Sequence, residues 1–187
     1  MRASPLDGTA LAACALMFCA PAGAEQDADP AFRSPVTAAF FAAGAGPAVC
    51  VDGGHHNFHA LAGRFRPLGE LLRSDGYTVR PIKGDLGQSY LGACGILVIA
   101  NAQPNDDDWE TYPYPTPPAF TAGEATALRR WVESGGALLL IADHMPFPGA
   151  AAPIAAAFGL EFNDGFAVEE FATEAAGHAS FRKPTLF

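Results

Sequence analysis

The sequence has little charge, and positive charge is especially scarce. Its 187 residues include 11 Lys and Arg against 20 Asp and Glu, a net charge of −9, and only 17% of residues are charged. It contains no run of basic residues, which nucleic acids and anionic membrane surfaces both require of a partner. Neither partner is therefore expected. With 50% hydrophobic residues, the chain is not disordered and can build the core of a single domain.

Motifs of several enzyme classes are also missing. There is no G-x-S-x-G elbow of a serine hydrolase, and the glycines at 53–54 lack the G-x-G-x-x-G spacing of a dinucleotide site. Cysteine is scarce, and Cys14 and Cys19 precede the cleavage site expected below. Cys50 and Cys94 alone are too few for a zinc–thiolate cage. We therefore expect none of these three chemistries.

The first 24 residues have the pattern of a signal peptide. Arg2 precedes an apolar run at 9–20, and residues 22–24 (AGA) have the small-x-small pattern of a cleavage site. The run is shorter than the roughly 20 apolar residues that span a bilayer, so no stable membrane span is expected. We expect a periplasmic or secreted protein cleaved after Ala24. The alternatives are a lipoprotein, with residues 11–14 as its cleavage box, and a disordered, alanine-rich terminus.

The rest of the chain divides into a flexible spacer at 25–47, with a short helix at 37–42, and one domain at 48–187. Apolar runs predict buried strands at 48–51, 95–100 and 137–142, an edge strand at 77–82 and a further strand at 160–162. Helical spacing and capping signals predict helices from Pro67 to Asp75, from Thr121 to Gly135, and over an alanine-rich stretch that ends at Phe158.

Near-continuous apolar strands that alternate with helices are typical of a parallel sheet covered on both faces. We predict an α/β, three-layer, flavodoxin-like fold with strand order 2-1-3-4-5. The last residues, through His178 to Phe187, show no periodic element that could close the sheet. The domain is therefore expected to be incomplete at its carboxyl end, with an exposed sheet edge.

Cys50 is expected within a strand and Cys94 just before the neighbouring one. A strand rises about 3.3 Å per residue, so this stagger would separate the two α carbons by more than the roughly 7 Å that a disulfide allows. We expect two buried free thiols.

Polar residues follow three of the predicted strands. Ligands of doubly wound sheets bind at the carboxyl ends of the strands, near the point where strand order reverses. Four of the five histidines lie in two of the loops at this edge. We expect Asp52 and Asp143, each directly after a buried strand, to aim their carboxylates into the crevice.

Three interpretations of this cluster stay open. Asp52, His55, His59 and His144 are the predicted ligands of a divalent metal, zinc or manganese, with Asp143 as a base or an orienting group. The same residues suit a metal-free site for a polar ligand. The third interpretation is that they only cap helices and satisfy loop backbone.

The residues predicted to contact substrate are His56, Asn57, Arg64, Asn101 and Trp109. Arg64 precedes a predicted helix and suits an anionic ligand group, the plainer alternative being a solvent-exposed arginine. Trp109 belongs to the acidic, aromatic loop 105–118, which is either a lid that stacks on a sugar or peptide, or a mobile insertion. Its acids at 106–108 are either a loose calcium site or a solvated charge run.

Three segments, VCVDGGHHNFHALAGRFRPLGELLRSDGY, ILVIANA and WVESGGALLLIADHMPFPGAA, resemble bacterial exported proteins that carry the domain of unknown function 4350. These proteins are grouped with class I glutamine amidotransferase-like folds, and the resemblance covers residues 48–166. It implies a flavodoxin-like domain without an assigned activity, in proteins that run on beyond this chain. Amidotransferases place a nucleophilic cysteine after the third strand. Asn101 stands there, so cysteine amidotransferase chemistry is not expected.

Together these patterns predict a hydrolase that acts on a small polar or carbohydrate-like substrate, with water activated by a metal or by a His/Asp base. The alternative is a non-catalytic domain that binds a glycan or an envelope ligand through the aromatic loop. A scaffold that needs a partner for its open edge is the third candidate.

Overall fold

The computed structural model describes residues 27–106, 113–165, 172–173 and 179–180. The predicted signal peptide and Trp109 lie outside these residues. The helices are α1 (Arg66–Ser74), α2 (Gln88–Leu91), α3 (Ala122–Glu133) and α4 (Phe147–Ala157); the strands are β1 (Ala48–Asp52), β2 (Thr78–Ile82), β3 (Ile96–Ala100), β4 (Ala137–Ile141), β5 (Ala172–Thr173) and β6 (Ala179–Ser180). No described helix has both the length and the hydrophobicity that crossing a bilayer requires.

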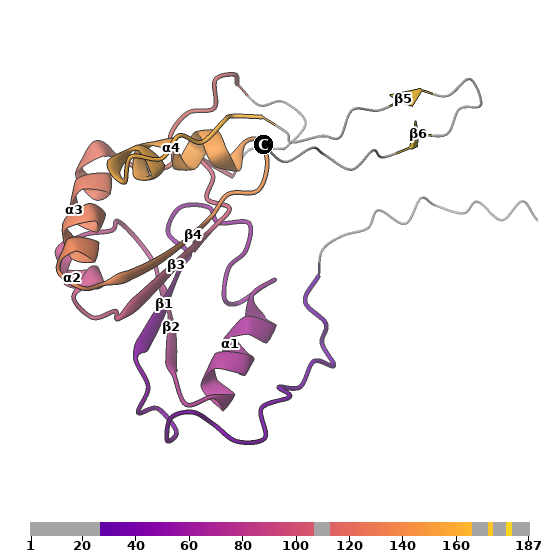
Figure 1. Ribbon diagram of the computed structural model, residues 1–187, viewed down its shortest axis with the longest axis vertical. Helices are drawn as coiled ribbons and strands as arrows, with labels where there is room; N and C mark the ends of the chain where they lie inside the picture. The colour runs from indigo at the N-terminus through magenta and orange to yellow at the C-terminus, as the bar shows by residue number, and fades with distance from the viewer. Residues whose placement is uncertain (1–26, 107–112, 166–171, 174–178, 181–187) are drawn as a thin grey trace, which may run out of the picture.

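Strands β1 to β4 form one parallel sheet with the order β2-β1-β3-β4 (Figure 1). The predicted α/β fold and its strand order are thus confirmed for four strands. The register pairs Asp52 with Ile82 and Ala100 with Ile141, so the carboxyl ends of the strands meet at one edge. The strand expected at 160–162 is wrong, because these residues have no regular structure; β5 and β6 form a separate antiparallel pair.

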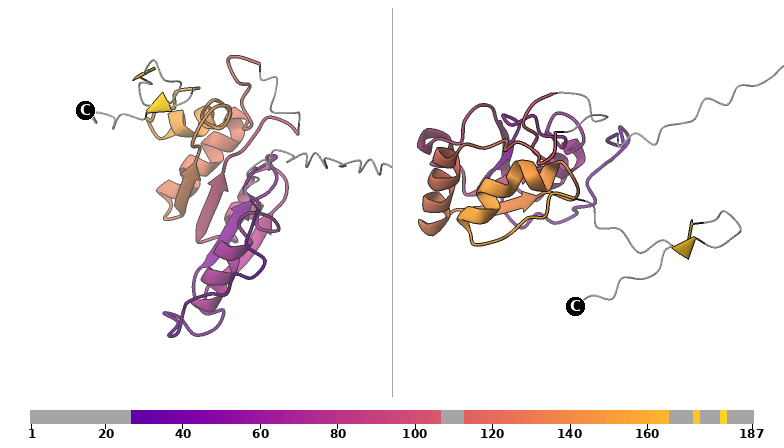
Figure 2. Two further views of the ribbon diagram at one scale, coloured as in Figure 1. Left: turned by 90° about the vertical axis from the view of Figure 1, so that its right-hand side faces the viewer. Right: turned by 90° about the horizontal axis from the view of Figure 1, so that it is seen from above.

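Helices cover both faces of the sheet, because alternate residues of a strand point to opposite sides. On one face, Cys50, Leu97 and Ile99 pack in a cluster with side chains of α2, α3 and α4. On the other face, Val49, Val51 and Val98 form a smaller cluster against Leu61, Phe65 and Leu72, around α1. Figure 1 and Figure 2 show α1 alone on its face, opposite the three other helices.

Strand β4 is not the buried strand that its ALLLI sequence predicts. Leu138 and Leu140 pack against the larger cluster, but Leu139 points to the other face and is 49% exposed. Apolar composition cannot distinguish a central strand from an edge strand, and β4 is paired only with β3 among the described residues.

The segment before β1 has no regular structure in its described part, and the helix expected at 37–42 is not formed. Its backbone is bonded to the turn after α1 instead. Phe41 N donates to the carbonyl of Asp75 at 3.2 Å, and Gly46 N donates to the carbonyl of Gly76 at 2.9 Å. The Phe41 ring packs edge-on against Tyr77 with 5.1 Å between ring centroids. Tertiary contacts therefore decide the path of this apolar stretch.

Local signals place the starts of α1 and α3 correctly. Proline stands in the first turn of α1, and the capping box of α3 is complete, with Thr121 Oγ1 accepting from Glu124 N at 3.2 Å and Glu124 Oε2 accepting from Thr121 N at 2.9 Å. Both helices begin within one residue of their predicted start. Capping depends on neighbours in the sequence, so the sequence alone predicts it.

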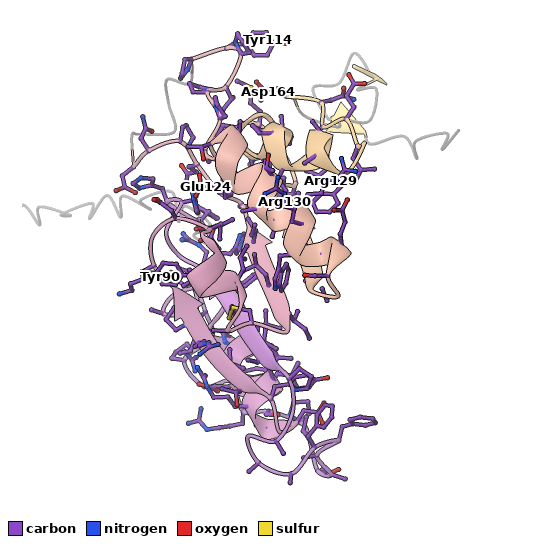
Figure 3. The ribbon with its side chains drawn as sticks, turned by 90° about the vertical axis from the view of Figure 1, so that its left-hand side faces the viewer. Tyr90, Tyr114, Glu124, Arg129, Arg130 and Asp164 are labelled. Atoms are coloured by element: carbon purple, nitrogen blue, oxygen red, sulfur yellow. A yellow bond between two sulfur atoms is a disulfide. The ribbon has the colours of Figure 1, made fainter. Side chains whose placement is uncertain are left out.

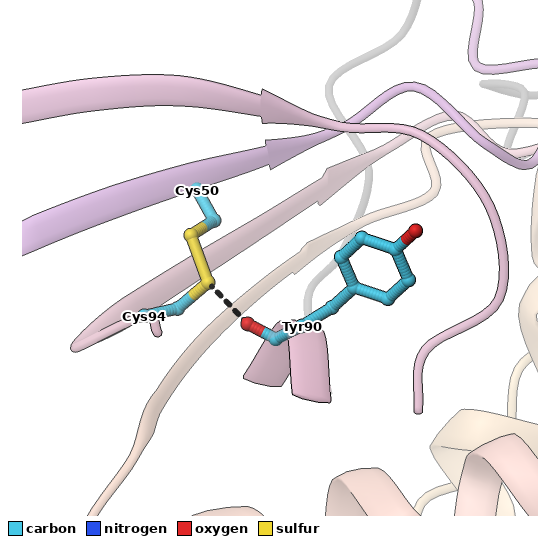
Figure 4. Close-up of a disulfide and its surroundings, with 3 residues drawn as sticks. All are labelled: Cys50, Tyr90 and Cys94. Carbon is cyan, nitrogen blue, oxygen red and sulfur yellow. Dashed lines mark hydrogen bonds between the residues drawn. A yellow bond between two sulfur atoms is a disulfide. The ribbon is translucent and has the colours of Figure 1, made fainter. Parts of the chain in front are cut away.

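The prediction of two free thiols is wrong: Cys50 and Cys94 form a disulfide with 5.8 Å between their α carbons (Figure 4). Cys50 pairs with Leu97 in the register, so a straight strand would place Cys94 about 10 Å away. Strand β3 begins only at Ile96, and Cys94 belongs to the turn after α2. This turn brings Cys94 back over the sheet face that carries Cys50. The Cys94 sulfur also lies 3.2 Å from the carbonyl oxygen of Tyr90.

Candidate functional site

Asp52, the last residue of β1, is completely buried and does not face a crevice as predicted. The turn that follows folds over its carboxylate. Gly54 N donates to Oδ1 at 3.1 Å, Asn57 Nδ2 donates to Oδ2 at 3.1 Å, and His55 Nδ1 lies 3.0 Å from Oδ2. A side chain at Gly54 would collide with the backbone of Gly84, at 2.5 Å, so glycine allows this turn to pack against the end of β2.

His55 contacts a second carboxylate through its other ring nitrogen. Nε2 lies 2.9 Å from Oε1 of Glu124 in the first turn of α3, and Phe120 packs on the imidazole with 4.3 Å between ring centroids. Glu124 Oε1 also accepts from Leu86 N at 3.0 Å, while Oε2 accepts from the Thr121 hydroxyl at 2.8 Å. Asp52, His55 and Glu124 thus form a buried triad that joins the end of β1 to α3.

The charges of the triad stabilise one another. Burial by itself would lower the pKa of His55, but the hydrogen bonds and negative charges of Asp52 and Glu124 outweigh it and raise that pKa above its ordinary 6.5. Burial opposes ionisation of Glu124, yet donors from Thr121 and Leu86 lower its pKa from 4.5 to about 2. Since both ring nitrogens face carboxylates, His55 is held as an imidazolium that donates twice.

This arrangement does not fit the predicted metal site. A metal-binding imidazole needs a deprotonated nitrogen, and both nitrogens of His55 are bonded to carboxylates. Within residues 27–106 and 113–165 and the short pairs beyond them, no three His, Cys, Asp or Glu side chains are grouped as metal ligands. Zinc or manganese binding stays a prediction that titration of the protein tests.

Asn101 follows β3 in a left-handed conformation with φ +50°, and it is 1% exposed. Its backbone is fixed by a hydrogen bond from its N–H to the carbonyl of Ile141 and one from Phe58 N to its carbonyl, both 2.9 Å. Its side-chain Nδ2 donates to Asp143 Oδ1 at 3.0 Å. Asn101 therefore positions the carboxylate of Asp143.

Asp143 and His144 follow β4, and both side chains are about half exposed. Asp143 Oδ1 also accepts from His144 N at 2.9 Å. His144 Nδ1 lies 2.8 Å from the carbonyl of Met145, which only accepts, so Nδ1 carries a proton and Nε2 is the basic nitrogen of the neutral ring. Nε2 is 4.0 Å from Asp143 Oδ1, so two proton acceptors lie close together.

Asp143 also lines a cavity of about 280 Å³. The segment after α4 forms another part of its wall, with Glu161, Phe162 and Asn163. A carboxylate, an aromatic ring and an amide make this a wall suited to a ligand rich in hydroxyl groups.

His59 and Arg64 lie in the loop between β1 and α1. The Arg64 guanidinium stacks on Phe58 with 3.8 Å to the ring centroid, and His59 packs against Phe65 with 4.9 Å between centroids. Burial lowers the pKa of His59, the charge of Asp143 opposes this shift, and the charge of Arg64 adds to it. His59 is thus close enough to both charges to respond to them.

Two further residues predicted to contact substrate, His56 and Asn57, form hydrogen bonds with other residues of the protein. His56, at φ +47°, places Nδ1 2.6 Å from the exposed carboxylate of Asp106. Asn57 closes its own turn, because its Oδ1 accepts from His55 N at 3.2 Å and its Nδ2 donates to Asp52. The predicted cluster therefore separates into a buried triad and a second group, the rim, which we define as His59, Arg64, Asn101, Asp143 and His144 and in which Asp143 and His144 are about half exposed.

Sequence reasoning missed Glu124 and Asp164, both labelled in Figure 3. The capping signal at Thr121 predicts a helix start but no site role for Glu124, although the amino end of a helix that leads into β4 faces the strands' carboxyl edge. Asp164 binds the backbone N–H of Thr116 at 2.7 Å and its hydroxyl at 3.0 Å, which joins the 113–120 loop to the cavity wall. No local pattern predicts this long-range contact.

No protein-family model matches the chain, and comparisons with curated proteins and with solved structures find no significant match. The fold and the rim therefore define a class only: a parallel α/β domain with polar side chains at the carboxyl edge of its sheet. The resemblance to the domain of unknown function 4350 stays a prediction.

Proposed function

We propose that this protein is an exported hydrolase of a small polar or carbohydrate-like substrate, with water activated at Asp143. The observation that carries the proposal is the position of Asp143: its carboxylate is held by Asn101 Nδ2 at 3.0 Å and lines a cavity of about 280 Å³. A fixed acceptor beside a cavity is what general-base catalysis requires.

In this proposal Asp143 accepts a proton from water while the water oxygen forms a bond to the electrophilic carbon of the substrate. The bond to the leaving group breaks, and the leaving group takes up the proton that Asp143 received. Asn101 Nδ2 orients the carboxylate by donating to Asp143 Oδ1, and Glu161 and Asn163, which line the same cavity, bind substrate hydroxyls. His144 Nε2 provides a second basic group close to the same carboxylate.

Export is part of the proposal, and the Cys50–Cys94 disulfide supports it. Disulfides form and persist in oxidising compartments such as the periplasm and the extracellular space. The signal-peptide pattern at residues 1–24 points to the same route.

The test is a kinetic comparison of Asp143→Asn with wild type on a panel of nitrophenyl glycosides and esters. We expect Asp143→Asn to lower kcat about 100-fold or more, as loss of a general base does, and to leave KM nearly unchanged. Glu133→Gln is the matched control. It changes an exposed acid at the end of α3, outside the cavity lining, and should keep full activity. Added EDTA, zinc and manganese test the metal-assisted form of the reaction. Turnover that survives Asp143→Asn, or wild type that hydrolyses none of the panel, would contradict the proposal.

One observation favours the second candidate, a non-catalytic glycan-binding domain. Tyr114 in the proline-rich loop is 75% exposed, and a solvent-facing aromatic ring can stack on a sugar (Figure 3). A binder would lose most of its affinity for a glycan in Tyr114→Ala and keep it in Tyr90→Ala, which removes another exposed tyrosine, 46% exposed, from α2. Affinity that is equal in both variants contradicts this candidate.

A further inference from the structure

Arg64 is a partly buried cation with no carboxylate partner in the described part of the chain. Arg66 and Arg129 form ion pairs with Glu70 and Glu133, whereas no described Asp or Glu oxygen lies within 4.0 Å of Arg64. Its Nε is completely buried and has no hydrogen-bond partner among the described residues. Charged groups that leave water are normally paired with an opposite charge, and Arg64 has no such partner among the described residues.

The contacts that Arg64 does make leave Nη2 of its guanidinium without a partner among the described residues. The plane stacks on the Phe58 ring at 3.8 Å, and Nη1 donates to the Phe58 carbonyl at 3.4 Å. Nε is enclosed by the protein, so a ligand would meet the Nη end of the group. A guanidinium binds a carboxylate through charge-assisted hydrogen bonds in a planar geometry that a lysine cannot reproduce.

Space for a ligand adjoins this arginine. Arg64, Arg66 and Gly63 line a surface hollow of about 400 Å³ between the loop before α1 and the segment at residues 27–30. Asp27 also lines the hollow but forms no ion pair with either arginine. His59, in the same loop as Arg64, has a pKa that responds to the charges of both Arg64 and Asp143.

We propose that Arg64 is the receptor for a carboxylate group of the ligand, which narrows the substrate class to acid-bearing molecules such as uronic acids. The inference rests on the proposed function for its role in turnover, since it places the acid group at Arg64 and the reacting bond at Asp143. Binding of the acid group itself needs no turnover and is measured separately.

The experiment is calorimetric titration of the folded protein with D-glucuronate, D-glucose and inorganic phosphate. Glucuronate should bind wild type at least tenfold more tightly than glucose, which has a hydroxymethyl group in place of the carboxylate. Arg64→Lys keeps the positive charge and the aliphatic stem but loses the planar guanidinium that stacks on Phe58 and its Nη donors, so its affinity for glucuronate should fall at least tenfold. Arg130→Lys makes the same exchange at an exposed position of α3 and should bind as wild type does (Figure 3).

Three results would overturn the inference: equal binding of glucuronate and glucose to wild type, unchanged glucuronate affinity in Arg64→Lys, or tighter binding of phosphate than of glucuronate. The comparison of the two sugars uses wild type alone and so does not depend on how a variant folds. Glucuronate binding without hydrolysis of any substrate would remove the proposed function and leave the carboxylate site standing. Hydrolysis of neutral sugars alone, with no glucuronate binding, would remove the carboxylate site and leave the proposed function standing.

Discussion

The Nε2 atom of His55 lies 2.9 Å from Oε1 of Glu124, although 69 residues separate them in the chain. This contact joins the turn after β1 to the first turn of α3, and Asp52 completes it from the end of the strand. A cation between two buried anions is stabilising only while all three are present, because removal of one leaves an uncompensated buried charge. The triad is therefore a structural element that supports the rim beside it.

Glu124→Gln tests the triad. The change removes one negative charge from His55 and should lower the free energy of unfolding by about 3 kcal/mol, as loss of one partner of a buried ion pair does. Glu133→Gln on the same helix breaks only an exposed pair with Arg129 and should cost less than about 0.5 kcal/mol. Urea denaturation of both variants measures the difference. Equal stability of the two would mean that His55 is not charged in the folded protein.

Stability should depend on pH through the same residues. Glu124 has a lowered pKa, so its contribution is present above 4.5 and is lost as pH falls towards about 2. His55 has a raised pKa, so its contribution is complete below 6.5 and is lost as pH rises through the folded-state value. The triad therefore stabilises the fold most between about pH 4.5 and 6.5.

Urea midpoints measured across this pH range check the prediction, with His55→Gln as the comparison. His59 acts in the opposite direction, because its lowered pKa disfavours the folded state below 6.5. Subtracting the His55→Gln profile from that of wild type removes this contribution. A difference that does not shrink as pH rises above 6.5 would contradict the assignment.

The disulfide should contribute substantially to stability. It links residues separated by 44 positions, and closing a loop of that length in the unfolded chain is worth about 4 kcal/mol at 25 °C in the chain-entropy model. Reduction with a phosphine should lower the urea midpoint of wild type accordingly. The double variant Cys50→Ala with Cys94→Ala should start at the lower stability and show no response to the reductant. An identical response of both proteins would mean that the bond is not formed in solution.

Gly149 in α4 should tolerate no side chain. An added Cβ would lie 2.5 Å from the Asp164 carboxyl carbon and 2.7 Å from Thr116 Cβ, so Gly149→Ala must displace the segment that forms the cavity wall. We expect a loss of about 1–3 kcal/mol in unfolding free energy, typical of overpacking. Gly123→Ala in α3 meets only the Thr121 hydroxyl, at an ordinary 3.8 Å, and should stabilise the helix by about 0.5–1 kcal/mol. Thermal unfolding distinguishes the two, and a stabilising Gly149→Ala would contradict the packing described here.

Part of the site was predictable because it depends on strand ends. Asp52, Asn101 and Asp143 each stand where an apolar run stops, and parallel strands bring these stops to one edge. Which of them face solvent was not predictable. Asp52 is enclosed by its own turn, whereas Asp143 is exposed, and both follow apolar strands with the same pattern.

The sequence by itself determined the alternation of strands and helices, the parallel order of the sheet and the cap of α3, because these depend on periodicity and on residues close together in the chain. Only the tertiary structure decided that Glu124 binds His55, that Cys94 turns back to reach Cys50, and that β4 is the last strand of the sheet among the described residues. Each of these depends on where a turn directs the chain through space, and the hydrophobic pattern carries no record of that direction. The same geometry places His55 in the buried triad and His59 and His144 in the rim, and on that separation the proposed chemistry depends.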